Sequence, residues 1–366
     1  MRQRSMLIRG GSLAALLSLL AAGVSACGES ASSGGDAGAA GADACPTAET
    51  TGDITLTVSS NLAVFAPVLL AIQDGAFKKA GLNVTVQRLS AAESVPLVAQ
   101  GKADAQVTSY SSAQFNAVSG GVDVKWILPL DTQPQARDDA VLPGFWARED
   151  VVGTGAQPDF AKLRGQTIGS QTSGTGISGK ILSDALAQGG LGLPDVKITR
   201  LVGADALAAL KNKAVAATWI ASPGEIEASK TAGLRRIATY PPGVTGTSII
   251  AGPKLLDRPA IAVKFAQVIS ETVKKYLVGD YRKQPESVTQ LTKALEVDAS
   301  VIQQTEPLVF DPDLSMAGAD KFLDDLQAFF LKENALDYKE ALPASRLIDT
   351  SVADSARTCS RAWFQP

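Results

Sequence analysis

The fold is indicated most clearly by residues 54–108, which read ITLTVSSNLAVFAPVLLAIQDGAFKKAGLNVTVQRLSAAESVPLVAQGKADAQVT. Apolar and polar residues alternate over 54–58, which predicts a strand, and Pro67 suits the first turn of the helix that follows. Further strands are expected over 82–86 and 105–108. Because strands alternate with helices, this stretch is typical of a parallel sheet with crossover helices.

The same alternation continues beyond this stretch. Ser90 and Glu93 have the spacing of a capping box, and the helix that they open should stop at Gly101. A fourth strand is expected over 124–130. Residues 142–150 contain proline, glycine and aromatic residues and are interpreted as a connection between two lobes.

A second run of alternating strands and helices begins at Thr167. Strands are expected at 167–170, 196–201, 214–220, 235–240 and 247–251, the last returning to the first lobe. Apolar residues at helical spacing over 261–276 and 322–330 predict helices packed on the first lobe. We therefore expect an α/β fold with mostly parallel sheets. Its expected parts are a leader (1–26), a tether (27–52), a first lobe (53–142 with 245–366) and a second lobe (143–244).

Composition excludes several kinds of active site. The 366 residues include no histidine, which rules out a Ser-His-Asp triad, a histidine-ligated zinc site and an imidazole general base. Three cysteines are too few for an all-cysteine tetrahedral metal site. The net charge of −3 makes nucleic acid an unexpected partner. No metal and no cofactor are expected.

The N-terminus has the order of a bacterial export signal. Arg2, Arg4 and Arg9 precede an apolar run over 13–24, which is too short to span a bilayer. The small residues before Cys27 resemble a lipobox, so cleavage before Cys27 and its lipidation are expected. An ordinary secretory signal is the alternative. Serine, glycine and alanine dominate the residues that follow, which predicts a flexible tether.

Two cysteines remain if Cys27 carries lipid. Export implies an oxidising compartment, where leftover cysteines usually pair. We therefore predict a disulfide between Cys45 and Cys359, which would tie the two ends of the fold together. Two free thiols on mobile tails are the alternative.

A glycine-rich turn over 174–179 spells a dinucleotide-binding motif, Gly-Thr-Gly-Ile-Ser-Gly. Residues 171–173 separate it from the preceding strand, and Asp195 begins the next strand instead of ending it, so a nucleotide site is not expected. A start of a helix with nearby hydroxyls instead predicts a small oxyanion site at Thr172, Ser173 and Thr175. Helix capping by Thr172 or Ser173 is the alternative.

Similar polar clusters follow two predicted strands of the first lobe. They are Ser59, Ser60 and Asn61 after the first strand, and Ser109, Tyr110, Ser111 and Ser112 after the third. Ligands of open α/β sheets bind at the carboxyl ends of the strands. The clusters therefore predict uncharged donors around one cleft.

Several segments together resemble solute-binding proteins of the nitrate/sulfonate/taurine type, which serve ABC importers. They are 65–67, 75–84, 100–105, 163–169, 204–210 and 233–238. The wider group takes in proteins of thiamine-precursor synthesis. The resemblance implies a type II periplasmic-binding fold with a ligand cleft between two hinged lobes. By position it implies ligand contacts from Ser60, Asn61, Phe65, Tyr110, Ser111, Ser112, Gln171, Thr172, Ser173, Gly174, Thr175, Trp219 and Ser222.

One departure from that family concerns the ligand. The family often has Trp-Glu-Pro after the strand that ends near residue 220, and here Ala221, Ser222 and Pro223 stand there. The missing carboxylate disfavours taurine and favours an anion or a neutral molecule. An organosulfonate is the first expectation, with nitrate, bicarbonate, a pyrimidine or a flavin-like ring as alternatives. Arg137 is the one basic residue near the hinge that could reach an anion, and surface exposure is the alternative for it.

The expected function is therefore solute capture for an ABC permease, by a monomer anchored through lipid on the outer face of the cytoplasmic membrane. An enzyme on the same fold is an alternative and would need an acid or base such as Asp131, Asp138 or Asp139, for which surface solvation is the simpler explanation. A surface sensor or adhesin is a further alternative. Phe65, Tyr110, Phe145, Trp146 and Trp219 could line a pocket or belong to the core.

Overall fold

The computed structural model describes residues 45–132, 141–172, 174–241, 245–361 and 363. The predicted leader, Cys27 and the first part of the tether lie outside these residues. So do Arg137, Asp138, Asp139 and Ser173.

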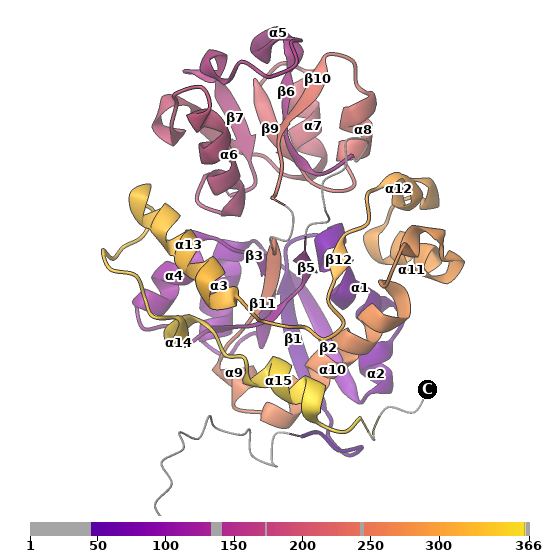
Figure 1. Ribbon diagram of the computed structural model, residues 1–366. Helices are drawn as coiled ribbons and strands as arrows, with labels where there is room; N and C mark the ends of the chain where they lie inside the picture. Colours follow the sequence, from indigo (N-terminus) through magenta and orange to yellow (C-terminus); the bar gives the residue numbers. More distant parts are fainter. Residues whose placement is uncertain (1–44, 133–140, 173, 242–244, 362, 364–366) are drawn as a thin grey trace, which may run out of the picture. The chain divides into compact units, whose positions relative to one another are not determined.

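The first sheet contains five strands in the order β2-β1-β3-β11-β4 (Figure 1). These are β1 (Gly52–Val58), β2 (Leu82–Arg88), β3 (Ala105–Ser109), β4 (Lys125–Pro129) and β11 (Thr247–Ala251). β1 is parallel to β2 and β3, whereas β11 is antiparallel to both of its neighbours. The expected return of 247–251 to the first sheet is confirmed.

The second sheet also has five strands, in the order β10-β6-β9-β7-β8. These are β6 (Gly144–Arg148), β7 (Thr167–Ser170), β8 (Lys197–Arg200), β9 (Ala217–Ile220) and β10 (Leu234–Ala238). β6 is antiparallel to both neighbours, and the other pairs are parallel. The expectation of mostly parallel sheets in an α/β fold is confirmed. The boundaries of the two lobes stay a prediction.

The interpretation of residues 142–150 as a connection is wrong. This segment forms β6 and the short helix α5 (Glu149–Val152). Its residues Gly144 to Ala147 are all buried, because β6 lies inside the sheet between β10 and β9. A strand buried on both faces shows no polar-apolar alternation, so periodicity did not indicate it.

Helices connect and cover the strands. They are α1 (Ala66–Gln73), α2 (Ala76–Lys79), α3 (Ala91–Ala99), α4 (Ser112–Ser119), α6 (Ile177–Ala187), α7 (Gly203–Lys211), α8 (Glu225–Lys230), α9 (Pro253–Leu256), α10 (Pro259–Tyr276), α11 (Pro285–Leu295), α12 (Ala299–Gln304), α13 (Ala319–Lys332), α14 (Ala344–Leu347) and α15 (Ser351–Thr358). Two short strands, β5 (Asp131–Thr132) and β12 (Val309–Phe310), pair with each other. Among the described residues, no helix is long and apolar enough to cross a bilayer.

The predicted capping box of α3 is present. The Ser90 backbone N–H donates to Oε2 of Glu93 at 2.9 Å, and the Glu93 N–H donates to the Ser90 hydroxyl at 3.4 Å. The apolar faces expected on the helices over 261–276 and 322–330 are also buried in hydrophobic clusters. Phe265 of α10 is buried and stacks on Phe77, whereas Phe330 of α13 packs in a different cluster.

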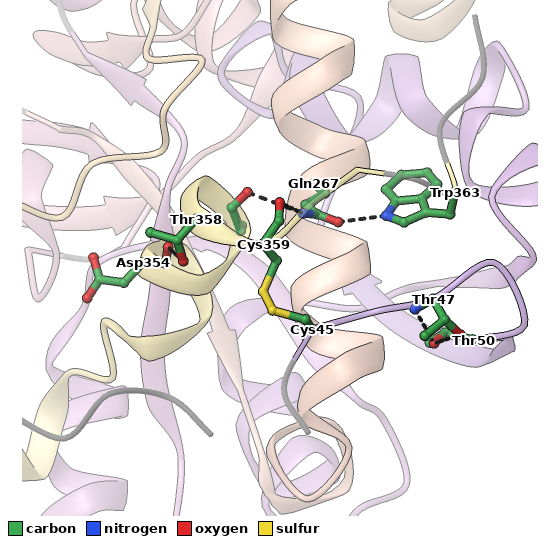
Figure 2. Close-up of a disulfide and its surroundings, with 9 residues drawn as sticks. Cys45, Thr47, Thr50, Gln267, Asp354, Thr358, Cys359 and Trp363 are labelled. Carbon is green, nitrogen blue, oxygen red and sulfur yellow. Dashed lines mark hydrogen bonds between the residues drawn. A yellow bond between two sulfur atoms is a disulfide. The ribbon is translucent and has the colours of Figure 1, made fainter. Parts of the chain in front are cut away.

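The two ends of the described chain meet at α10 (Figure 2). The sulfur atoms of Cys45 and Cys359 are joined, and their Cα atoms are 5.4 Å apart. Gln267 of α10 donates to the Cys359 carbonyl at 3.2 Å and accepts from the indole N–H of Trp363 at 2.8 Å. The two cysteines therefore have the placement that the predicted pairing requires.

The last residues of the predicted tether are held against the fold. The ammonium group of Lys264 donates to the carbonyl oxygens of Thr47 at 3.2 Å and Thr50 at 2.7 Å. Lys264 is 1% exposed, so these bonds satisfy a buried charged group. Residues 47 and 50 of the predicted tether are therefore anchored to α10.

Candidate functional site

A cavity of about 220 Å³ lies where four strands end. β1 and β3 of the first sheet end at Val58 and Ser109, and β7 and β8 of the second end at Ser170 and Arg200. The residues around the cavity are Ser59, Ser60, Leu62, Phe65, Ser90, Ala91, Thr108, Ser109, Ser111, Gln171, Thr172, Arg200, Val202 and Gly203. The cavity thus occupies the position at which α/β sheets bind ligands.

In two other cavities the charged residues of the lining already form ion pairs. One, of about 400 Å³, is lined by Arg148, Asp150 and Lys213, whose charges already pair with each other. Another, of about 150 Å³, contains Asp74 and Lys275, which also form an ion pair. The cavity at the four strand ends combines residues from both sheets, so we treat it as the candidate site. In its lining, the hydroxyls of Ser90, Thr108, Ser111 and Thr172 bond within the protein, whereas those of Ser59, Ser60 and Ser109 form no hydrogen bond among the described residues.

A buried glutamine fixes the turn between β3 and α4. Gln114 is fully buried, and its Oε1 accepts from the N–H of Ser111 at 2.6 Å and from the Ser111 hydroxyl at 2.8 Å. Its Nε2 donates to the carbonyl of Ser109 at 3.1 Å. This network sets the positions of two serines that line the cavity.

Two glycines of the glycine-rich turn are required by the backbone itself. Gly174 has a φ of +85°, in the left-handed region that favours glycine. A Cβ atom on Gly179 would lie 2.0 Å from the carbonyl oxygen of Gly174, so no larger residue fits there. The spacing of these two glycines is therefore explained without a nucleotide.

The start of α6 is covered by the first sheet's polar turn. The N–H of Ile177 donates to the carbonyl of Tyr110 at 3.2 Å, and the N–H of Ser112 donates to the carbonyl of Thr175 at 2.9 Å. The Thr175 hydroxyl donates to the carbonyl of Thr172 at 2.7 Å. The donors expected to form an oxyanion site at this helix start are thus largely used within the protein.

The predicted contact residues fall into two groups. Ser60, Phe65, Ser111, Gln171 and Thr172 line the cavity, and the structure brings them together from both sheets. The structure places Asn61, Tyr110, Ser112, Gly174, Thr175, Trp219 and Ser222 outside the lining, and Ser173 lies beyond the described residues.

The residues outside the lining have other roles. Asn61 accepts a hydrogen bond from the guanidinium of Arg88. Trp219 is buried between Phe145, at 5.3 Å between ring centroids, and Tyr240, at 4.9 Å. Tyr110 stacks on Trp126. These aromatic side chains belong to the core, as do Phe145 and Trp146.

Arg200 is the main residue that the sequence reasoning missed. It is exposed, ends β8, and is the only charged residue among those that line the cavity. Its charge lowers the pKa of Glu93, after the larger effect of the hydrogen bonds from Ser90. A cation near the carboxyl end of the strand predicted over 196–201 was the available signal.

Two buried carboxylates lie outside the lining. Asp131, expected on the hinge surface, is fully buried and accepts from the Thr247 hydroxyl at 2.5 Å, so the expected solvation is wrong. Glu225 is also fully buried and accepts from the Ser222 hydroxyl at 2.6 Å. Burial raises the pKa of Glu225 to about 7. Within the described part of the chain, no group of three acidic or cysteine residues could hold a metal ion.

Solved structures share the fold at low sequence identity. The chain is similar to the alkanesulfonate-binding protein SsuA from Xanthomonas axonopodis pv. citri bound to MOPS, with a TM-score of 0.62, 17% identity, and 81% of this chain and 97% of that chain covered. It is similar to the periplasmic aliphatic sulphonate binding protein SsuA from Escherichia coli, with a TM-score of 0.58, 17% identity, and 82% and 93% covered.

A third similar structure is the periplasmic nitrate-binding protein NrtA from Synechocystis PCC 6803, with a TM-score of 0.59, 14% identity, and 85% and 86% covered. No curated protein sequence matches the chain. These similarities confirm the periplasmic-binding fold that the sequence resemblance implies. The sequence model of the family described as NMT1/THI5 like matches residues 63–277, which is more than half of the chain. The chain therefore belongs to the NMT1/THI5-like family.

Proposed function

We propose that the protein is the extracytoplasmic solute-binding component of an ABC importer, and that it captures a small anionic solute in the cavity at the four strand ends. The observation that carries this proposal is the lining itself. It combines uncharged hydroxyls from both sheets with a single charged residue, Arg200. Reversible capture needs converging donors and no reactive group, and this lining meets both conditions.

The apolar part of the lining favours a solute with a hydrocarbon body. Leu62, Phe65 and Val202 line the cavity together with Ala91. An organosulfonate joins such a body to an anionic head with three acceptor oxygens. The cavity is smaller than the roughly 300–1,000 Å³ of sites for drug-sized ligands, which fits a short chain.

The similar structures agree with this chemistry. Two of them are sulfonate-binding proteins and one is a nitrate-binding protein. Their identity to this chain is low, so they support the class of ligand only together with the lining. Nitrate and bicarbonate would use Arg200 and the hydroxyls but leave the apolar residues without a partner.

The cellular context follows from the N-terminal sequence. Export, cleavage before Cys27 and lipidation of that cysteine would place the fold on the outer face of the cytoplasmic membrane. Residues 27–44 would act as the tether, and the partner would be the membrane permease of the importer. We expect a monomer.

Catalysis on a heteroaromatic ligand is less well supported. The residues that line the cavity include no carboxylate, and the buried Asp131 is not among them. A general acid or base must come within hydrogen-bond reach of the substrate. Phe65 is the one aromatic residue in the lining, so a pyrimidine or flavin ring would find a single aromatic side chain to stack on.

The proposal is tested by thermal shift and calorimetry on residues 27–366 carrying Cys27→Ser. The ligands are short alkanesulfonates, taurine, nitrate, bicarbonate, a pyrimidine and riboflavin. A ligand at about one hundred times its Kd should add about 2.7 kcal/mol to the free energy of unfolding. We expect alkanesulfonates to raise the Tm most. A shift with ring compounds alone would support the heteroaromatic alternative, and no shift with any anion would overturn the proposal.

A further inference from the structure

We propose that Arg200 and Glu93 act together as a charge filter that admits solutes with one negative charge and disfavours those with two. The inference rests on the proposed function, since it concerns which anions the same cavity accepts. Arg200 would hold the anionic head at the β8 side of the cavity, and Glu93, which is bonded to the lining residue Ser90, would repel a second negative charge at the start of α3.

Arg200 is available to a ligand, unlike a comparable arginine nearby. Arg200 ends β8, an edge strand of the second sheet, and Arg88 ends β2, an edge strand of the first. Both are exposed, but Arg88 donates a hydrogen bond to Asn61 and does not line the cavity. Across the residues that the structure describes, Arg200 forms no hydrogen bond or ion pair, so its guanidinium can serve a solute.

The neighbours of Arg200 in the lining suit a sulfonate head. Gln171 and Thr172 follow β7, which is paired with β8, and both line the cavity. They can donate a side-chain amide N–H and a hydroxyl to oxygens that the guanidinium leaves free. Leu62 and Phe65, from the first sheet's side, leave an apolar surface for the rest of the molecule.

Glu93 provides the opposing charge from the other sheet's side. Its carboxylate accepts from the Ser90 N–H at 2.9 Å and from the Ser90 hydroxyl at 2.6 Å, and Ser90 lines the cavity. Glu93 is exposed and does not itself line the cavity, but these bonds hold its carboxylate next to Ser90, and the charge of Arg200 contributes to lowering the pKa of Glu93. A second anionic group on the solute would meet Glu93, whereas an alkyl end would not.

The single positive charge of Arg200 by itself also limits how much negative charge a bound solute can carry. Arg200 is the single cation among the residues that line the cavity, so a monoanion can pair with it, whereas the second charge of a dianion would find no cation there. Leaving a buried charge without a partner is costly. The lining and the position of Glu93 therefore point to the same preference for monoanions.

The test compares propanesulfonate, a monoanion, with 3-sulfopropionate, a dianion of similar length, by calorimetry. The variants are Arg200→Gln, Arg200→Lys and Glu93→Gln, with Arg88→Gln and Glu340→Gln as controls. Glutamine at position 93 keeps the acceptor of the capping box, so α3 should remain intact. The Tm and circular dichroism of each variant verify that it folds.

We expect Arg200→Gln to weaken propanesulfonate binding at least about tenfold and to reduce its salt dependence, because a charged hydrogen bond is lost. Arg200→Lys should retain part of the affinity and the salt dependence. Glu93→Gln should lower the ratio of the 3-sulfopropionate Kd to the propanesulfonate Kd by about two- to fivefold. The two controls should behave as the unmodified protein.

The outcomes separate the two proposals. Unchanged propanesulfonate binding in a folded Arg200→Gln variant would overturn the charge filter and leave solute capture standing. An unmodified protein that binds the dianion as tightly as the monoanion would overturn the filter as well. An unmodified protein that binds neither anion would overturn the proposed ligand class, and the filter with it.

Discussion

The N–H of Ile177 donates to the carbonyl oxygen of Tyr110 at 3.2 Å, which joins the first turn of α6 to the residue that follows β3. A second backbone bond, from Ser112 to Thr175 at 2.9 Å, runs beside it. A helix start is a ready anion site only while its N–H groups are free. The first bond uses an N–H of α6, and the second occupies the Thr175 carbonyl at the same turn, so this turn packs against the first sheet's polar turn. We therefore expect the anion at the residues just before the glycine-rich turn.

The first prediction compares two threonines of that turn. Thr172 lines the cavity, and its hydroxyl shares a hydrogen bond of 3.3 Å with the Ser178 hydroxyl, which can act as its donor and leave the Thr172 proton for a ligand. The exposed Thr175 instead donates its hydroxyl to the Thr172 carbonyl. Thr172→Val should weaken alkanesulfonate binding about tenfold, since a hydrogen bond to a charged group is lost. Thr175→Val should change the Kd less than about twofold. Calorimetry decides between them, and a larger effect at Thr175 would return the anion to the helix start.

The second prediction concerns the buried Gln114. Gln114→Leu would leave the N–H of Ser111 and the carbonyl of Ser109 without their present partner. We expect the free energy of unfolding to fall by about 1–3 kcal/mol and the affinity to fall with it, because both serines line the cavity.

Urea unfolding and calorimetry measure the two effects of Gln114→Leu. Gln303→Leu is the control, since Gln303 is an exposed residue of α12. Lost stability with an unchanged Kd would show that the turn is structural only. No loss of either would mean that other groups satisfy the serine backbone.

The third prediction concerns Cys45 and Cys359, which are separated by 314 residues in the sequence. Closing so long a loop should stabilise the fold by up to about 5 kcal/mol, through the lower entropy of the unfolded chain. In a Cys27→Ser background, thiols should react with an alkylating reagent only after reduction, and the exposed Cys45 should then react before the buried Cys359. Cys359→Ser should shift the urea midpoint as reduction does. Thiols that react without reduction would contradict the pairing.

Local signals made much of the fold predictable. The Ser90–Glu93 capping box, the alternation over 54–58 and the stripe of α10 each reflect contacts within a few residues of the chain or one buried face. β6 gave no such signal because it is buried on both sides. The sequence thus predicted the alternation of elements better than the full membership of the second sheet.

The candidate site was predictable only in part, for a related reason. Serines and threonines after strands indicated the right edge of the sheets, and Ser60, Ser111 and Thr172 do line the cavity. Whether a donor is free depends on partners far along the chain, as Ile177 and Tyr110 show. No spacing in the sequence could reveal that bond, nor that the Arg200 guanidinium would form no hydrogen bond with the residues that the structure describes.

The last prediction concerns Glu225, which is fully buried in α8 with its Oε2 atom unpaired among the described residues. Burial raises its pKa from 4.5 to about 7, against smaller opposing effects of the Ser222 hydroxyl and the charge of Arg236. The unfolded chain releases this proton near pH 4.5, whereas the folded chain keeps it to about pH 7. Between these values the folded state binds more protons than the unfolded state.

The free energy of unfolding should therefore fall as the pH rises through this window, by roughly 3 kcal/mol from this group. Glu225→Gln has no proton to release, so it should remove this part of the pH dependence and be more stable than the unmodified protein at about pH 8. Ser222 can still donate to the amide oxygen of the new side chain.

Urea unfolding between about pH 5 and pH 8 measures the difference. Glu227→Gln is the control because Glu227 lies in the same helix, is exposed, and pairs with Lys211 at 2.8 Å. That control should keep the pH dependence of the unmodified protein. Parallel curves for the unmodified protein and Glu225→Gln would mean that the buried carboxyl releases its proton at the same pH in the folded and unfolded chains, which its burial beside Ser222 argues against.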